Sequence, residues 1–179
     1  MLFRSHGLQV WEAVYAAGAA FGITPYGTEA MHVLRAEKGY IIVGQETDGT
    51  ATPDDAGLSW AIGKNKTDFV GLRSLQRPTM KRADRKQLVG LKPKDGRTVL
   101  DEGAQVCERP AQRPPMQLIG HVTSSYAAST VGFPIALAMI AGGRARMGAT
   151  LYVSQPSGDV EVEVCSPVFY DPEGVRVNG

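Results

Sequence analysis

Apolar residues spaced three and four positions apart open the chain and predict an amphipathic helix over residues 8–21. The positions that form this apolar face are Leu8, Trp11, Val14, Tyr15, Gly18 and Phe21. Gly22 follows them as a residue that commonly ends a helix. A second helix is predicted from Thr28, a good N-cap, to Gly39, with Lys38 supplying the positive charge that helix ends favour.

The middle of the chain predicts a loop, a strand and a short helix in turn. Residues 44–55 are rich in Gly, Thr and Asp and are expected to form a loop. Residues 58–62 alternate between apolar and polar side chains and predict a strand. Thr67 and Asp68 are expected to cap a short helix, which Pro78 ends.

After a basic, solvated segment at residues 81–86, the hydrophobic period changes to two. Six short strands separated by Gly- and Pro-rich turns are predicted, at residues 88–91, 105–108, 117–122, 135–140, 150–153 and 160–165. This pattern is typical of a small antiparallel barrel or sandwich. The chain is therefore predicted to have two domains, a mixed α/β region at residues 1–80 and an all-β region at residues 81–179.

The composition is that of an ordinary globular protein, with 43% hydrophobic residues in a chain of 179. The formal net charge of +1 argues against a binding surface for nucleic acid or an anionic membrane. No apolar run reaches the roughly 18 residues that a membrane helix needs, and no secretory signal opens the chain. Cys107 and Cys165 are therefore expected to be two buried thiols, not a disulfide, in a cytoplasmic protein.

Several motifs of known chemistry are absent from the sequence. It lacks a phosphate-binding loop, a dinucleotide-binding glycine motif, a nucleophile elbow and a zinc-protease motif. The histidines His6, His32 and His121 are too scattered to suggest a metal site. No nucleophile–base pair can be identified, so neither a metal nor a catalytic residue is predicted.

Arg35 is the residue that the pattern singles out as a candidate ligand-binding group. It shares a helix face with Met31 and His32 and lies in a run of apolar and small residues. Its guanidinium could hold a carboxylate or a polar ring edge through two parallel hydrogen bonds. On composition alone, an ion pair with Glu37 or a neighbouring strand, or simple exposure to solvent, is the more common role for such an arginine.

Three stretches of the chain resemble the aminomethyltransferase, or glycine-cleavage T-protein, family. The motif Tyr26-Gly27-Thr28-Glu29-Ala30-Met31 is followed by Leu34-Arg35-Ala36-Glu37-Lys38-Gly39-Tyr40, and together they resemble the folate-side motif of that family. Residues 120–126 are similar to the stretch that opens the family's terminal barrel. The tail at residues 167–174 resembles that of the alpha subunits of heterotetrameric sarcosine oxidases, whose last region belongs to this family.

The resemblance implies a fold and a binding site. The implied fold is α+β, with a partial α/β folate-binding region followed by a small antiparallel β-barrel. The implied contacts with tetrahydrofolate are Arg35, whose counterpart is associated with folate in the family, and more weakly Glu37 and Tyr40. Ala36 stands where the family usually has a larger aliphatic residue, which leaves the arginine in place. The hydroxyl side chains of residues 123–125 could also bind a ligand, although satisfying the backbone of a sharp turn is their more common role.

The resemblance also implies a function. The chain is expected to be a C-terminal fragment of a sarcosine oxidase alpha subunit, catalytically incomplete alone, that helps to capture the one-carbon unit of sarcosine as methylene-tetrahydrofolate. The implied partners are tetrahydrofolate and the other sarcosine oxidase subunits, with NAD and flavins bound elsewhere in the complex; no nucleic acid or membrane partner is expected. Two alternatives stay open, a noncatalytic assembly piece of the complex and a fragment of a free-standing aminomethyltransferase.

Overall fold

The computed structural model describes residues 4–110, 115–128 and 130–178, and the chain forms two compact units, Met1–His32 and Val33–Gly179. In the first unit, η1 (Arg4–His6), α1 (Gly7–Gly18) and η2 (Ala19–Phe21) form a continuous helical segment. Gly22 adopts a left-handed conformation that ends it, which confirms the helix predicted over residues 8–21.

The apolar face of α1 is exposed in this unit. The rings of Trp11 and Tyr15 stack with centroids 5.2 Å apart, and both side chains contribute to a surface depression with Ile23 and Tyr26. Phe21 is 88% exposed. Among the described residues of this unit, η1, α1 and η2 contain no buried side chain, so the apolar stripe of the helix is not covered within its own unit.

The second unit begins within α2 (Thr28–Glu37), whose predicted start at Thr28 is confirmed. The amide of Gly39 donates to the carbonyl of Ala36, and that of Tyr40 to the carbonyl of Arg35, which close the last turn. Gly39 has a φ of 74°, a left-handed conformation that glycine adopts without strain. The predicted stop at this glycine is confirmed as well.

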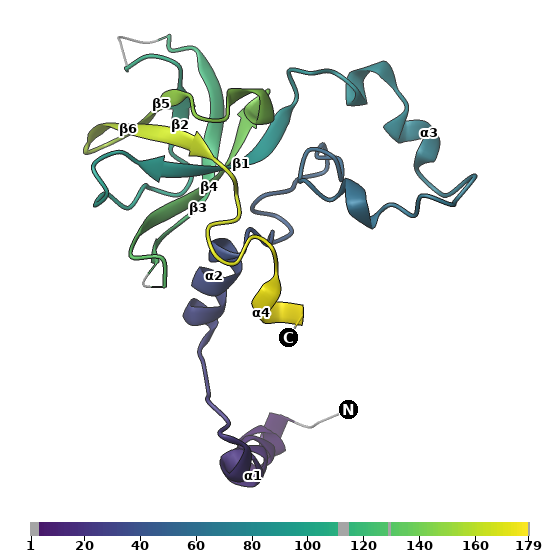
Figure 1. Cartoon of the computed structure of the whole chain (residues 1–179), viewed down its shortest axis with the longest axis vertical. Helices are drawn as coiled ribbons and strands as arrows, with labels where there is room; N and C mark the ends of the chain where they lie inside the picture. The colour runs from purple at the N-terminus through teal and green to yellow at the C-terminus, as the bar shows by residue number, and fades with distance from the viewer. Residues whose placement is uncertain (1–3, 111–114, 129, 179) are drawn as a thin grey trace. The chain divides into compact units, whose positions relative to one another are not determined.

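Six antiparallel strands form a closed barrel in the order β1-β4-β3-β2-β5-β6 (Figure 1). The strands are β1 (Lys86–Pro93), β2 (Gln105–Cys107), β3 (Leu118–Ala128), β4 (Phe133–Ala141), β5 (Thr150–Gln155) and β6 (Gly158–Cys165). A short 3-10 turn, η5 (Gly143–Arg146), joins β4 to β5. All six predicted strands are present, and the barrel, not the sandwich, is the arrangement that they adopt.

The two faces of β4 belong to two different apolar clusters, because successive side chains of a strand point to opposite sides. Ala136, Ala138 and Ile140 face the barrel interior with Val89, Leu91, Val106, Val122, Leu151, Val153, Val162 and Val164. Ile135, Leu137 and Met139 face outward, where they pack with Ala36 and the partly buried Val33, Ile41 and Phe169. The last turn of α2 is therefore held against the outer face of the barrel.

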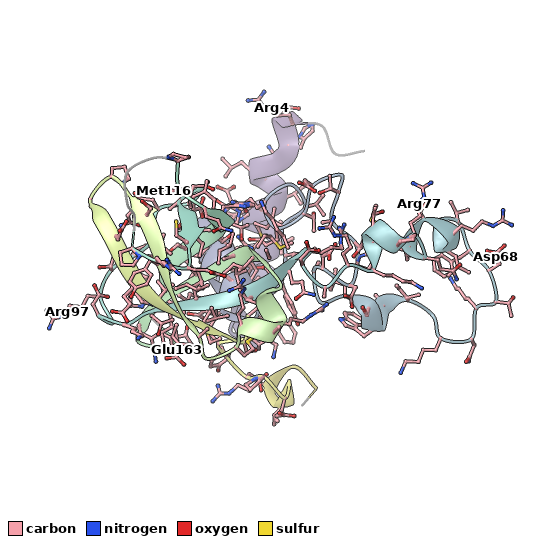
Figure 2. The ribbon with its side chains drawn as sticks, turned by 90° about the horizontal axis from the view of Figure 1, so that it is seen from above. Arg4, Asp68, Arg77, Arg97, Met116 and Glu163 are labelled. Carbon is pink, nitrogen blue, oxygen red and sulfur yellow. The ribbon has the colours of Figure 1, made fainter. Side chains whose placement is uncertain are left out.

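Residues 57–84 form an arm that contains no buried side chain. It carries η3 (Ser59–Ala61), α3 (Leu72–Leu75) and η4 (Pro78–Met80), and Figure 2 shows Asp68 and Arg77 far from the barrel strands. The prediction of a strand at residues 58–62 is wrong: the segment contains η3, none of the strands in the described part of the chain pairs with it, and Trp60 is 77% exposed. The short helix begins at Leu72, later than the predicted caps at residues 67 and 68.

Both cysteines are free thiols, as expected from the sequence, but the expectation that both are buried is met only by Cys107. Cys107 is buried, and burial raises the pKa of the partly buried Cys165 to about 11, with Glu163 adding to the rise. Such thiols are poor nucleophiles at neutral pH. No helix among the described residues is long and apolar enough to cross a membrane.

Candidate functional site

Arg35 lies at the last turn of α2 and is almost completely enclosed, with 9% of its side chain exposed. Nη1 lies 3.0 Å from Oε2 of Glu46 and donates to the carbonyl of Tyr40 at 3.2 Å. Nη2 donates to Oγ of Ser124 at 2.6 Å and to Oε1 of Gln45 at 3.2 Å. The guanidinium therefore joins the helix end to the following loop and to strand β3.

Glu46 is the acidic partner of Arg35, and its side chain is fully buried. Ser124 donates to Oε1 at 2.5 Å and the amide of Ile42 donates to Oε2 at 2.7 Å, so both carboxylate oxygens are occupied. Burial alone would raise the pKa of Glu46, but the hydrogen bonds from Ser124, Ile42 and Arg35 together lower it below its ordinary value. Glu46 is therefore an anion at neutral pH, and its hydrogen bonds with Ser124 and Ile42 position the carboxylate beside Arg35.

A surface cavity of about 350 Å³ lies beside this ion pair. Gln45 and Glu46 line it together with Asp48, Thr50, Asp55, Arg85, Lys86, His121 and Met139. Burial and the nearby charge of Lys86 lower the pKa of His121, so its imidazole is neutral at pH 7. The volume is at the lower end of the range for small-molecule sites, and the lining is rich in polar groups.

A second ion pair, between Arg85 and Asp55, joins the two ends of the arm and lines the same cavity. Arg85 Nε lies 3.0 Å from each carboxylate oxygen of Asp55, and Nη2 donates to the carbonyl of Thr50 at 2.7 Å. Asp55 also accepts from the amide of Thr52 at 2.8 Å. Burial would raise the pKa of Asp55, but Arg85 and Thr52 more than offset this and lower it. The two ends of the arm are thus fixed to one another.

The three residues predicted to contact folate have different surroundings. Arg35 and Tyr40 are joined by their backbones and by the Nη1 hydrogen bond, while the Tyr40 side chain is 57% exposed. Glu37 is 1% exposed and does not pair with Arg35, whose acidic partner is Glu46 instead. One carboxylate oxygen of Glu37, Oε1, is buried with no hydrogen-bond partner among the described residues.

The hydroxyl residues at positions 123–125 lie inside strand β3, so the alternative of a sharp turn is wrong. The register of β3 against β4 shifts between Val122 and Ser124, which is the mark of a bulge. Thr123 donates to Leu137 and Ser125 to Ile135, both backbone carbonyls of β4. The shift places the Ser124 hydroxyl on the Arg35 side of the strand, and that contact could not be predicted from a period of two.

Glu46 makes the stability of the fold pH dependent in a predictable direction. Its folded-state pKa lies below the ordinary value of 4.5, so the unfolded chain takes up the proton first as the pH falls. The contribution of Glu46 to stability is complete above the unfolded-state pKa of about 4.5 and is lost as the pH falls through the lower folded-state pKa. We expect Glu46→Gln to flatten the dependence of the unfolding free energy on pH at pH values below 4.5, measured by urea unfolding.

Glu102→Gln is the matched control for this measurement, because Glu102 is an exposed carboxylate. It should keep the slope of the parent chain. A slope that is the same in Glu46→Gln and in the parent would contradict the assignment of Glu46 as one of the carboxylates whose protonation destabilises the fold in acid.

Two family models and several curated proteins are similar to this chain. Residues 2–66 match the family model described as the GCVT N-terminal domain, and residues 86–171 match the glycine cleavage T-protein C-terminal barrel domain. Among curated proteins, sarcosine oxidase subunit alpha of Corynebacterium sp. (strain U-96) is 51% identical over 97% of this chain and 18% of its own length. The aminomethyltransferase of Nostoc sp. (strain PCC 7120) is 32% identical over 82% of this chain and 36% of its own.

A solved structure shows the same arrangement. The glycine cleavage system aminomethyltransferase T from Bartonella henselae superposes with a TM-score of 0.67 and 26% sequence identity. The match covers 80% of this chain and 38% of that one. The chain thus spans about a fifth of the sarcosine oxidase subunits and less than half of the aminomethyltransferases that it matches.

Proposed function

The chain belongs to the glycine-cleavage T-protein family of aminomethyltransferases, and from this premise we propose that it is the C-terminal region of a sarcosine oxidase alpha subunit. In that role it contributes to the tetrahydrofolate-dependent capture of the one-carbon unit released from sarcosine. The observation that carries the proposal is the buried Arg35–Glu46–Ser124 cluster. Arg35 and Glu46 come from the segment that matches the N-terminal domain, and Ser124 from the barrel.

Tetrahydrofolate supplies the nitrogen atoms that capture a one-carbon unit when it is bound. The protein's task in such a transfer is to orient the reacting groups and keep water away, so catalysis is largely positioning. A guanidinium fixed by Glu46, Ser124, Gln45 and the Tyr40 carbonyl is suited to that task. It has lost nearly all of its rotamer freedom before any ligand arrives.

Two polar atoms of the proposed site are buried and lack a partner among the described residues. Four of the five guanidinium N–H groups of Arg35 have acceptors, and the remaining one, on Nε, is buried without a partner among the described residues. Oε1 of Glu37 is a buried acceptor in the same condition. Each such group costs about 1–3 kcal/mol. A folate offers ring nitrogens and carboxylates as acceptors, and ring N–H and amino groups as donors.

Tyr40 completes the proposed contacts from the protein surface. Tyr40 is 57% exposed, although its backbone amide and its carbonyl are both hydrogen-bonded to Arg35. An aromatic ring that is exposed on a rigid backbone can stack on a flat ligand without first losing contacts of its own. In the proposal, Tyr40 offers tetrahydrofolate a stacking face, while the Nε–H of Arg35 and Oε1 of Glu37 are a donor and an acceptor that a ligand reaches only when these buried atoms are uncovered.

The proposal predicts that replacement of Arg35 by lysine weakens folate binding by about tenfold, because a point charge replaces a planar fork. The measurement is a calorimetric titration of the chain with 5-formyl-tetrahydrofolate, a stable folate. In the full-length enzyme, the same change should reduce the yield of folate-dependent product and leave sarcosine oxidation nearly unchanged.

Arg144→Lys is the control for this titration. Arg144 also binds a carboxylate and a carbonyl, both of Asp54, but it lies outside the cavity and the Arg35 cluster. Equal folate affinities of Arg35→Lys and the parent would show that Arg35 does not contribute to the proposed folate site. If the parent chain and the full-length enzyme both failed to bind the folate, the proposed function would be lost.

An assembly role is the second candidate, and the arm is the observation that favours it. Residues 57–84 contain six Lys and Arg residues against two Asp residues, so the arm carries a net charge of +4 while the whole chain carries +1. Trp60 and the fully exposed Val70 lie on the same segment. Exposed apolar side chains within a basic segment are suited to another subunit of the complex.

A further inference from the structure

Residues 166–174, here called the strap, leave the barrel at the end of β6 and cross the last turn of α2 (Figure 1). The backbone amides of Phe169 and Tyr170 both donate to the carbonyl of Glu37, at 2.8 and 2.9 Å. The last carbonyls of a helix have no partner within the helix. The strap therefore satisfies an acceptor that the helix itself leaves open.

An ion pair fixes the strap to the next residue of the helix end. Nζ of Lys38 lies 3.0 Å from Oδ2 of Asp171 and also donates to the backbone carbonyl of Asp171. The two side chains are only 15% and 10% exposed. Asp171 itself has a φ of 47°, which is uncommon for a residue with a side chain. Such a conformation persists where the surroundings hold it in place.

Gly39, the third residue of the helix end, lies so close to the strap that a larger residue would not fit at this position. A Cβ on Gly39 would lie 2.7 Å from the carbonyl oxygen of Pro167, a distance that real Cβ atoms do not reach. The left-handed φ of Gly39 independently favours glycine. Phe169 adds an apolar anchor, because it packs in the cluster that includes Ala36 on α2.

The three residues held by the strap lie between two contacts of Arg35. The amide of Tyr40 donates to the Arg35 carbonyl at 2.8 Å, and Nη1 of Arg35 donates to the Tyr40 carbonyl at 3.2 Å. Residues 37–39 lie within the part of the chain that these two hydrogen bonds enclose, residues 36–39. A shift of the strap would therefore move both the backbone and the guanidinium of Arg35.

We propose that the strap is a latch that positions Arg35, and that Lys38 and Asp171 are positioning residues for the folate site. The identity of the ligand in this inference rests on the proposed function, whereas the contacts by which the strap holds the helix end do not depend on it. It also links the two family domains, because Lys38 lies in the segment that matches the N-terminal domain and Asp171 is the last residue matched by the barrel domain. The strap thus gives Arg35 an indirect connection to the barrel besides its contacts with Ser124 and Tyr126 of β3.

The test replaces Lys38 by methionine, which keeps the length and the apolar stem of the side chain and removes its charge. Amide hydrogen exchange should become at least about tenfold faster at Gly39 and Tyr40, while amides of β4 keep their rates. The affinity for 5-formyl-tetrahydrofolate should fall by about tenfold, because a small misplacement of a positioning group is costly. Lys38→Arg, which restores the charge, should recover most of both effects.

The control is Lys94→Met, which breaks an ion pair with Glu161 on the exposed side of the barrel. It should leave both measurements unchanged. Unchanged exchange at Gly39 and Tyr40 in Lys38→Met would overturn the latch, whether or not the parent binds folate.

Two further outcomes separate the latch from the proposed function. Faster exchange with unchanged folate affinity would show that the strap holds the helix without positioning a ligand, and the positioning role would be rejected. If the parent chain binds no folate, the positioning role fails together with the proposed function, while the exchange rates still decide whether the strap holds the helix end.

Discussion

Replacement of Arg35 by methionine is expected to lower the free energy of unfolding by about 3–5 kcal/mol, which is the usual cost of removing one partner of a buried ion pair. The reason is the burial of Glu46, whose side chain is fully enclosed when Arg35 is present. Without the guanidinium, the carboxylate must either stay charged without its cation or take up a proton. Ser124 and Gln45 lose a donor in the same change.

The double variant Arg35→Met/Glu46→Gln separates this electrostatic cost from a loss of packing. Glutamine keeps an acceptor for the amide of Ile42, which donates to Glu46 at 2.7 Å, and carries no charge. We expect the double variant to recover more than half of the stability lost in Arg35→Met, measured by urea unfolding at pH 7. If the two variants were equally unstable, the cost would come from packing and not from the unpaired carboxylate.

Replacement of Gly120 by alanine is expected to destabilise the chain by about 2–3 kcal/mol through steric overlap in the barrel wall. Gly120 lies in β3 opposite Ile140 of β4 and Val106 of β2. A Cβ at this position would lie 2.3 Å from the carbonyl oxygen of Met139 and 2.9 Å from Cα of Ile140. Both are backbone atoms of a strand paired on each side, so a rotamer change cannot relieve the overlap.

Gly49→Ala is the matched control for the barrel variant. Gly49 lies in the loop after α2, its φ is outside the left-handed region, and a Cβ there would meet no atom within 4 Å. Its change in unfolding free energy should stay within about 0.5 kcal/mol, as for ordinary surface substitutions. A loss for Gly120→Ala as small as that of the control would mean that β3 and β4 can separate at this point.

The sequence predicts the barrel well because each strand carries its own signal. Alternation in β6, with Val160, Val162 and Val164 facing inward, is readable from six residues alone. The segment at residues 58–62 has a similar alternation but forms the turn η3, with Trp60 exposed. The alternation of apolar and polar residues indicates which side chains a strand would bury, but a strand also needs a neighbouring strand. None of the strands that the structure describes pairs with residues 58–62.

The candidate site was predictable only in part, for a related reason. The position of Arg35 on a helix face follows from local spacing, but its partners Glu46 and Ser124 lie 11 and 89 residues further along the chain. Nothing local distinguishes Glu46 from the other polar residues of its loop. Lys38 illustrates the same limit, because it was expected to complement the helix end and in fact also binds Asp171, 133 residues away.

The closed barrel restricts how this module can meet other polypeptides. Every strand has a hydrogen-bonded neighbour on both sides over at least part of its length, so among the described residues no strand offers a whole free edge for a foreign strand to extend. Recognition is therefore expected to rely mainly on loops and side chains. The pairing of β1 with β6, from Gly90 opposite Cys165 to Pro93 opposite Val162, is the seam that closes the cylinder. Separation of β1 from β6 would expose two unpaired strand edges. Copies of the chain could then join edge to edge through the same strand pairing that closes the barrel.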